Sequence, residues 1–489
     1  MGGGRSNYQD APTRRESLPQ RKPMARNSAH APLLWIVASG FFMQTLDTTI
    51  VNTALPAMAT DLGVTALALK PIVVAYMITM AMIMPASGWL ADRYGSRNVY
   101  FTTILTFVVG SLLCALSSSP TQLVMARVLQ GAGASMLLPI GRLTVLRTVS
   151  PKEFISALAF MAIGGQIGPI FGPVLGGVFV QALSWHWIFL INVPVGLVGM
   201  WAVRKYMPAQ RLEDTPRFDF IGCVLLAACL VAFSVALDVP TADHQAAWAT
   251  GLIVLSGLAA LGYYAHARRR EYPLFPLSLF HERNYTVGIA GNLVCRIGAA
   301  AVPFLLPLMM QLGMGYSPLH SGLMLVPVAA AGAVSKSWVS PLIMRFGYER
   351  FLVANTLFVG FWIISFALFS PTWPLWLQIV QLAAFGLGNS MQFSAMNSVT
   401  LTSLNPQQAG PGNSLFSMFQ MVAMGLGVTV AGGLVTLIAG PARHLVPAFT
   451  WSFVCVGLIT SLSALVWLRL DNQRLAQVVK QAQPASKAA

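Results

Sequence analysis

Charged residues are scarce in this sequence. Only 9% of its residues are Asp, Glu, Lys or Arg, whereas soluble domains carry roughly 25%. Hydrophobic residues make up 56% of the chain and the mean hydropathy is +0.66. This composition excludes an ordinary soluble globular protein. It indicates an all-α integral membrane protein, because long apolar segments span a bilayer as helices.

Cysteines are few, and each lies inside an apolar segment. The spacing of the five therefore predicts neither a disulfide framework nor a metal site, and we interpret them as small core residues. The formal charge of +15 is compatible with nucleic-acid binding. However, the basic residues occupy short loops and tails between apolar runs, so we expect no nucleic-acid partner.

Apolar runs long enough to cross a bilayer, about 20 residues each, recur along the whole chain. We count fourteen, near residues 33–57, 70–91, 98–117, 121–146, 154–181, 185–207, 218–238, 248–266, 284–312, 320–343, 351–369, 374–401, 413–438 and 448–470.

The basic residues alternate with these runs and fix the expected orientation. They gather at the tails and after every second span, in 5–26, 93–97, 147–152, 204–217, 268–283, 345–350 and 469–487. The opposite loops contain almost only Lys70 and Arg443. Because positive loops stay on the cytoplasmic side, we expect both termini there.

Two sequence echoes indicate an internal duplication. GWLADRYGSRN (88–98) resembles RFGYER (345–350), and Arg345 follows Arg93 by 252 residues. The glycines of the fifth and thirteenth spans echo at a similar offset. We therefore expect two six-helix bundles, at 32–207 and 284–470, with two inserted spans and a cytoplasmic linker at 208–283. The polar stretches 1–31, in place of a cleavable signal peptide, and 471–489 are expected to be cytoplasmic tails, the first disordered.

Four motifs occur in order along the chain. They are LDTTIVNTALP (46–56), GWLADRYGSR (88–97), RVLQGAGAS (127–135) and GPIFGPVLGG (168–177). Together they resemble motifs of the major facilitator superfamily, and within it the fourteen-span drug:proton antiporters of the EmrB/QacA type. The text around SWHWIFLINVPVG (184–196) is most similar to the bacterial MdtD-like branch.

This resemblance implies the major facilitator fold and a transporter rather than an enzyme. It implies a monomer in the bacterial inner membrane that exports small molecules or drugs by alternating access. Its partners would be a small-molecule substrate, protons and the lipid bilayer, with no cofactor, and the proton gradient would drive it.

The fifth span carries small residues at a regular spacing. Glycines recur every four residues, which gives a helix a flat face that another backbone can approach closely. Prolines interrupt the same helix and favour a bend. Close packing alone explains the glycines, whereas the resemblance assigns the set to an antiporter motif: Gly164, Gly168, Pro169, Gly172, Pro173 and Gly176.

Asp47 is the one acidic residue placed well inside a predicted span. It lies ten residues from the outer end of its span, about 15 Å deep, and Arg127 lies about 9 Å deep in the fourth span. We interpret them as a proton-coupling pair, in which Asp47 takes a proton from outside and releases it inside while Arg127 tunes it. The alternative is a static buried ion pair.

The loop after the second span is a candidate cytoplasmic gate. The resemblance implies that Asp92 pairs with an arginine or caps a neighbouring helix. A solvated loop that only sets topology is the alternative. The candidate gate residues are Gly88, Asp92, Arg93, Gly95 and Arg97.

Cations outnumber acids inside the predicted spans, where Arg142, Arg296 and Lys336 join Arg127. This excess favours an organic anion, such as citrate or a metal–carboxylate chelate, as an alternative substrate. The alternative role of Arg142 and Lys336 is to anchor helices. The full set of candidate cavity residues adds polar side chains: Gln44, Asn52, Arg142, Gln166, Arg296, Lys336, Gln392 and Asn397.

Other functions fit the sequence less well. Clustered catalytic motifs and phosphate loops are lacking, which disfavours a membrane enzyme. The short loops disfavour a sensor with an output domain, while an importer on the same fold stays open. We expect spans seven and eight to be peripheral, and Pro273 and Pro276 to keep 268–284 from forming one helix.

Overall fold

The computed structural model describes residues 30–211, 217–238, 245–440, 444–471 and 475. Within these ranges the regular structure is helical and contains no strand. The two tails predicted at 1–31 and 471–489 lie almost entirely outside the described residues. Pro273 and Pro276 separate two helices, as predicted, because α11 ends at Arg269 and the next helical turn begins at Leu277.

Thirteen helical segments are long and apolar enough to cross a membrane, counted over the described residues by length and composition. The predicted twelfth span is not among them, although a 28-residue helix, α16 (Leu375–Thr402), occupies its position. The glutamines and asparagines of α16 lower its hydropathy. With α16 as the fourteenth segment, each predicted span coincides with one to three consecutive helices.

The first half of the chain forms helices that pack mainly on one another. α1 packs along α7, α5 packs on α2 and α4, and α4 packs on α9. Their bounds are α1 Ala31–Asp61, η2 Ala66–Leu69, α2 Lys70–Ile83, η3 Met84–Ala86, α3 Ser87–Tyr94, α4 Ser96–Ala115, α5 Pro120–Ala134, α6 Leu137–Thr148, α7 Pro151–Ala182, α8 Trp187–Leu190 and α9 Asn192–Tyr206.

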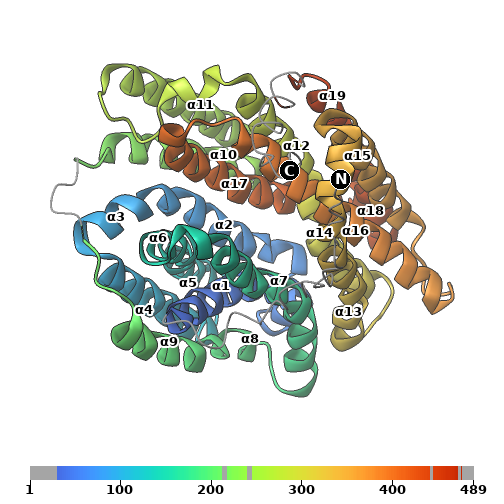
Figure 1. Cartoon of the computed structure of the whole chain (residues 1–489). Coiled ribbons are helices and arrows are strands. Elements are labelled where there is room, and N and C mark those ends of the chain that lie inside the picture. The colour runs from blue at the N-terminus through green and yellow to red at the C-terminus, as the bar shows by residue number, and fades with distance from the viewer. Residues whose placement is uncertain (1–29, 212–216, 239–244, 441–443, 472–474, 476–489) are drawn as a thin grey trace, which may run out of the picture.

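The second half repeats this plan, and Figure 1 shows its yellow to red helices beside the blue to green helices of the first half. α14 packs on α16, α12 on α17 and α15 on α18. The remaining bounds are η4 Leu277–His281, α12 Arg283–Leu308, the π-helical turn η5 Met309–Gly313, α13 Pro318–Met324, α14 Val326–Phe346, α15 Tyr348–Ser365, η6 Phe366–Leu368, α17 Pro406–Ala439, α18 Leu445–Leu462 and α19 Ala464–Trp467.

The same turn occurs in both halves at the position of the sequence echo. Gly95 links α3 to α4 with φ 86°, and Gly347 links α14 to α15 with φ 80°. Glycine suits both positions, since a positive φ strains other residues. The two glycines are 347 − 95 = 252 residues apart, the same offset as the echo itself. We call the end of the molecule that carries these turns the turn end; the domain boundaries at 207/208 and 283/284 stay predictions.

The two halves meet closely at the end opposite the turn end. A Cβ on Gly177 would come within 2.7 Å of Leu319 Cα, and one on Gly322 within 2.8 Å of the Pro173 carbonyl carbon. Gln311 Nε2 donates to the backbone oxygen of Thr53 across the halves at 3.0 Å. One hydrophobic cluster joins α1, α2, α12, α17 and α18 at this end, so the contact between the halves is closed there.

The inserted helices α10 (Phe220–Asp238) and α11 (Gln245–Arg269) form a pair beside α17 (Figure 1). α10 also packs on α2, so this pair contacts both halves of the chain.

Candidate functional site

Asp47 and Arg127 form a buried ion pair between α1 and α5. Arg127 Nη1 lies 2.7 Å from Asp47 Oδ2, and the exposed fractions of the two side chains are 1% and 0%. Arg127 Nε donates to the Ile72 backbone oxygen at 3.2 Å, and its guanidinium lies 4.0 Å from the centre of the Tyr76 ring. The pairing predicted from their similar depth is confirmed; its role in proton coupling stays a prediction.

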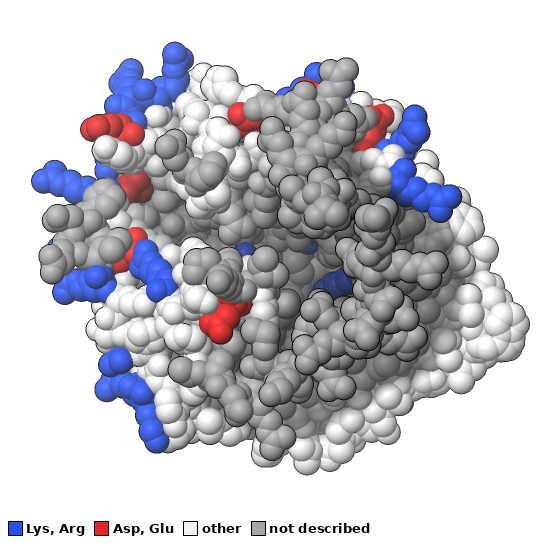
Figure 2. Space-filling model, in the orientation of Figure 1, with Lys and Arg blue, Asp and Glu red and all other residues white. Residues whose placement is uncertain are grey.

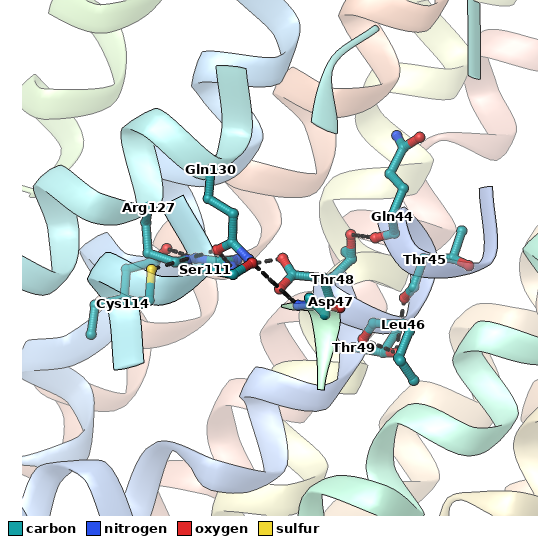
Figure 3. A network of polar contacts seen from close by, with 12 residues as sticks. Gln44, Thr45, Leu46, Asp47, Thr48, Thr49, Ser111, Cys114, Arg127 and Gln130 are labelled. Atoms are coloured by element: carbon teal, nitrogen blue, oxygen red, sulfur yellow. Dashed lines mark hydrogen bonds and ion pairs between the residues drawn. The ribbon is translucent and has the colours of Figure 1, made fainter. Parts of the chain in front are cut away.

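Three further side chains extend this pair into a hydrogen-bonded network. Gln130 Nε2 donates to Asp47 Oδ1 at 2.8 Å and also to Ser111 Oγ at 2.8 Å, while Arg127 Nη1 donates to Gln130 Oε1 at 2.6 Å. Asn192 Nδ2 reaches Asp47 Oδ1 from α9 at 3.3 Å. Figure 3 shows Arg127, Gln130 and Ser111 gathered around Asp47, with the Gln44 side chain pointing away from it.

These contacts determine what the pair can do chemically. Both carboxylate oxygens accept hydrogen bonds, and this compensates for taking a charged group out of water. Breaking a buried pair at one partner leaves the other charge uncompensated, at a cost of roughly 3–5 kcal/mol. Loss of either charge therefore disfavours the buried arrangement.

A cavity of about 660 Å³ lies between the halves and extends toward the turn end. Its described lining comes mostly from α1, α2, α6 and α17, and includes methionines from α2 and α17. Gln44, Thr45, Thr48 and Thr49 face it from α1, whereas Asp47 does not line it. Helix α1 thus presents the ion pair on one side and the cavity wall on another.

Arg142 is the only charged residue among the described residues that line this cavity. Its side chain is exposed, and no ion pair or hydrogen bond joins it to any residue that the structure describes. An unpaired guanidinium in an otherwise apolar and neutral polar cavity is suited to hold an anionic group. Of the predicted cavity residues, Gln44 and Arg142 line the cavity.

The other predicted cavity residues lie outside its lining. Gln392 is buried against α15, where it donates to Thr356 and accepts from Asn355, and Lys336 is exposed on α14. Asn52 is buried on α1, and Gln166 Nε2 donates to the backbone of its own helix.

Arg296 lies in a separate buried cluster of the second half. Its Nη2 donates to Asn397 Oδ1 at 3.0 Å, its Nε donates to Asn292, and its guanidinium lies 4.0 Å from the Phe393 ring centre. Gln420 lines the cavity and donates to the same Asn397 oxygen at 3.0 Å. One hydrogen-bonded residue therefore separates Arg296 from the cavity wall, and Asn397 supports that wall from behind.

The candidate gate residues lie at the turn end. Asp92 pairs with Arg147 at 2.7 Å, so the predicted arginine partner comes from the last turn of α6. Arg97 donates to the backbone oxygen of Met207, which ties α4 to the segment after α9. Gly88 lines the cavity and Arg93 is exposed. The pairing of Asp92 is confirmed, and its function as a gate stays a prediction.

We expect the Asp92–Arg147 pair to couple by less than about 1 kcal/mol, because both side chains are partly exposed and water screens their attraction. A double-mutant cycle with Asp92→Asn and Arg147→Gln, followed by thermal unfolding in detergent, measures this energy. A gate role predicts that the same variants change the transport rate far more than the stability. Equal wild-type transport by all three variants contradicts it.

The glycine face of α7 packs against α1. A Cβ on Gly168 would lie 2.7 Å from the Leu46 nitrogen, and one on Gly176 would lie 2.7 Å from the Ile50 oxygen. Gly164 and Gly172 likewise leave no space for a side chain beside α1. α7 is a continuous helix that includes Pro169 and Pro173. The predicted close backbone approach is confirmed, and its partner is the helix that carries Asp47.

Comparisons with known proteins agree with this fold. The model of the Major Facilitator Superfamily matches residues 37–428. Two relatives named "Putative multidrug resistance protein MdtD", from Serratia proteamaculans (strain 568) and Citrobacter koseri, are 46% and 43% identical over 445 and 449 residues. These alignments cover 89% and 90% of this chain, and 93% and 94% of the two relatives.

Solved structures share the fold at low sequence identity. A D-xylose-proton symporter matches with a TM-score of 0.67 at 12% identity, over 91% of this chain and 99% of the symporter. The nucleoside transporter NupG matches with a TM-score of 0.63 at 12% identity, over 90% of this chain and 98% of NupG. The chain is therefore a multi-pass membrane protein that belongs to the Major Facilitator Superfamily of transporters.

Proposed function

We propose that this protein is a proton-coupled exporter of small molecules, among them drugs, that works by alternating access as a monomer in the bacterial inner membrane. The names of the MdtD relatives support drug efflux. The observation that carries proton coupling is the position of α1. On this one helix Asp47 pairs with Arg127, whereas Gln44 and Thr48 line the cavity.

The charge distribution supports the membrane orientation of this proposal. Figure 2 shows Lys and Arg side chains along the left, top and upper-right rim of one face of the molecule. The basic loops predicted as cytoplasmic include those at the Gly95 and Gly347 turns, so the turn end faces the cytoplasm with both termini. The cavity then extends toward the cytoplasm, while the halves are closed at the outer end. This arrangement corresponds to an exporter ready to load its substrate from inside.

Purified protein in liposomes with an imposed pH gradient tests the proposal. Tetraphenylphosphonium, as a lipophilic cation, and citrate, with and without iron, are added in turn, and dissipation of the gradient is recorded. We expect at least one probe to be transported in exchange for protons and so to dissipate the gradient. Protein-free liposomes serve as the control. Transport of a probe without proton movement contradicts the coupling, and movement of neither probe contradicts the proposed function.

A second candidate substrate class is organic anions, and the unpaired Arg142 in the cavity favours it. Citrate and metal–carboxylate chelates belong to this class. Their carboxylates match a guanidinium in both charge and geometry.

We expect Arg142→Gln to lower citrate transport by roughly ten- to a hundredfold, because a hydrogen bond to a charged group contributes about 1.5–3 kcal/mol. The rate of tetraphenylphosphonium transport should stay unchanged or rise, because the variant removes a positive charge that repels this cation. Arg350→Gln, which changes an exposed arginine that is not part of the cavity lining, is the matched control. Equal losses for both probes in Arg142→Gln would argue that Arg142 is structural.

A further inference from the structure

The linker between the halves forms part of the cavity wall. Leu274 and Phe275, which follow α11, are among the residues that line the cavity. Phe275 is 2% exposed and packs in a cluster with Phe416 and Met418 of α17. Residues 274–275 therefore lie between the inserted helix pair and the cavity. The sequence pattern did not indicate this position.

Asp219 holds this segment in place. It lies directly before α10 and is 3% exposed. Its Oδ2 accepts from the Leu274 backbone nitrogen at 2.9 Å, and its Oδ1 accepts from the Gly222 nitrogen at 3.0 Å and lies 2.7 Å from His266 Nε2. Arg270 Nε lies 3.5 Å from the same oxygen. One carboxylate thus joins the start of α10, the end of α11 and the linker.

The surroundings keep this carboxylate charged. Burial acts to raise the pKa of Asp219, but the hydrogen bonds from His266, Leu274 and Gly222 outweigh it and lower the pKa. Gly222 is required for this fit, since a Cβ there would lie 2.8 Å from the carboxylate carbon. The contacts therefore form a single preorganised clamp, which we call the Asp219 clamp (Asp219, Gly222, His266, Arg270 and Leu274).

A second connection fixes the next residue of the linker. The Tyr263 hydroxyl donates to the Phe275 backbone oxygen at 3.0 Å and accepts from the Phe275 backbone nitrogen at 2.9 Å. On the other side of the clamp, Phe218 lies against Trp89 of the candidate gate motif, with 5.1 Å between ring centres. The inserted pair therefore joins the gate motif of the first half to the cavity wall beside α17.

We propose that Leu274 and Phe275 contact the substrate and help determine its specificity, and that Asp219 is the positioning residue that presents them. This inference rests on the proposed transport function, because it concerns the same cavity. Leu274 and Phe275 add an aliphatic and an aromatic side chain to a lining that also contains the methionines of α2. The segment that follows the inserted helices thereby completes the binding site, while no described residue of α10 or α11 lines the cavity. The part of the substrate that meets this wall is apolar.

Thiol labelling tests the wall directly. Leu274→Cys is introduced after the five native cysteines have been replaced by alanine, and the rate of reaction with N-ethylmaleimide is measured with and without tetraphenylphosphonium or citrate. We expect a transported probe to slow labelling at position 274 several-fold. Labelling that a transported probe leaves unchanged overturns the contact role while the proposed function stands. Transport of neither probe overturns the proposed function and, with it, the contact role.

Asp219→Asn tests the clamp by the same assay and does not depend on transport. We expect faster labelling at position 274, because the linker is released from α10 and α11. Glu271→Gln is the matched control, since it removes a negative charge from an exposed position in the same linker. An unchanged labelling rate in Asp219→Asn overturns the positioning role.

Transport kinetics separate positioning from general destabilisation. With the native Leu274 present, Asp219→Asn should raise KM several-fold while the maximal rate stays close to wild type, because the variant weakens substrate binding rather than the transport cycle. A loss confined to the maximal rate overturns the positioning role.

Discussion

Export driven by a proton gradient falls at least about a hundredfold when Asp47 is replaced by asparagine, because the variant has no group to carry the proton and leaves Arg127 with an uncompensated buried charge. Uptake of a transported probe into everted membrane vesicles, with and without a pH gradient, measures this loss. Asp61→Asn, at the end of the same helix, removes a charge but keeps an oxygen that can accept the 2.8 Å hydrogen bond from Trp185 Nε1, and it serves as the control.

The buried charge that Asp47→Asn leaves behind also destabilises the fold, so a second variant is needed. Asp47→Asn combined with Arg127→Gln removes both charges and should recover much of the lost stability, since replacing a whole buried pair is far less costly than breaking it. Proton-driven export should nevertheless stay low in the double variant. Its recovery to the wild-type rate would show that the pair is only structural.

The expected loss follows from the way α1 connects two sites. Thr48 and Gln44 face the cavity, while Asp47 faces α5 and accepts hydrogen bonds from Gln130 and Arg127. A proton shifts the balance between two conformations only as far as its affinity differs between them. Because one helix carries both sites, a change at the ion pair also alters the cavity wall.

Much of the membrane topology could be predicted from the sequence. The alternation of apolar runs with basic loops located the spans, because bilayer thickness fixes the length of a spanning helix. Similar depth in their spans was enough to pair Asp47 with Arg127. Gln130 was missed, although it lies three residues after Arg127 on the same helix face, and this spacing was a usable signal. Asn192 comes from α9 and gave no such signal.

The cavity lining was harder to predict, because it depends on how each helix is rotated. Gln392 and Gln420 are both polar residues within spans, yet Gln392 is turned toward α15 and Gln420 toward the cavity. Helix rotation is set by packing between neighbours rather than by composition, and α16 and α17 carry polar residues on several sides. Leu274 and Phe275 lie in a linker, where hydrophobic periodicity gives no information about burial.

The glycine face of α7 predicts that replacing glycine by alanine lowers the free energy of unfolding at one position, whereas it raises it at a glycine with open space around it. Gly168→Ala should destabilise the protein by about 1–3 kcal/mol, because the added Cβ would lie 2.7 Å from a backbone nitrogen of α1 that cannot move aside. Gly251→Ala should instead stabilise it by about 0.5–1 kcal/mol, since Gly251 of α11 has open space around it and alanine favours a helix. Thermal unfolding of both variants in detergent measures this difference.

A second glycine shows whether the contact with α1 causes the effect. At position 172 the nearest obstacle is the side-chain hydroxyl of Thr49, and the next atoms lie at 3.0 and 3.2 Å. Thr49→Ala should therefore relieve much of the destabilisation of Gly172→Ala. Thr45→Ala should not rescue Gly168→Ala, because the Leu46 nitrogen stays in place. Equal rescue at both positions would show that backbone contact is not the reason for glycine at position 168. Side-chain packing alone would then explain the α1–α7 interface.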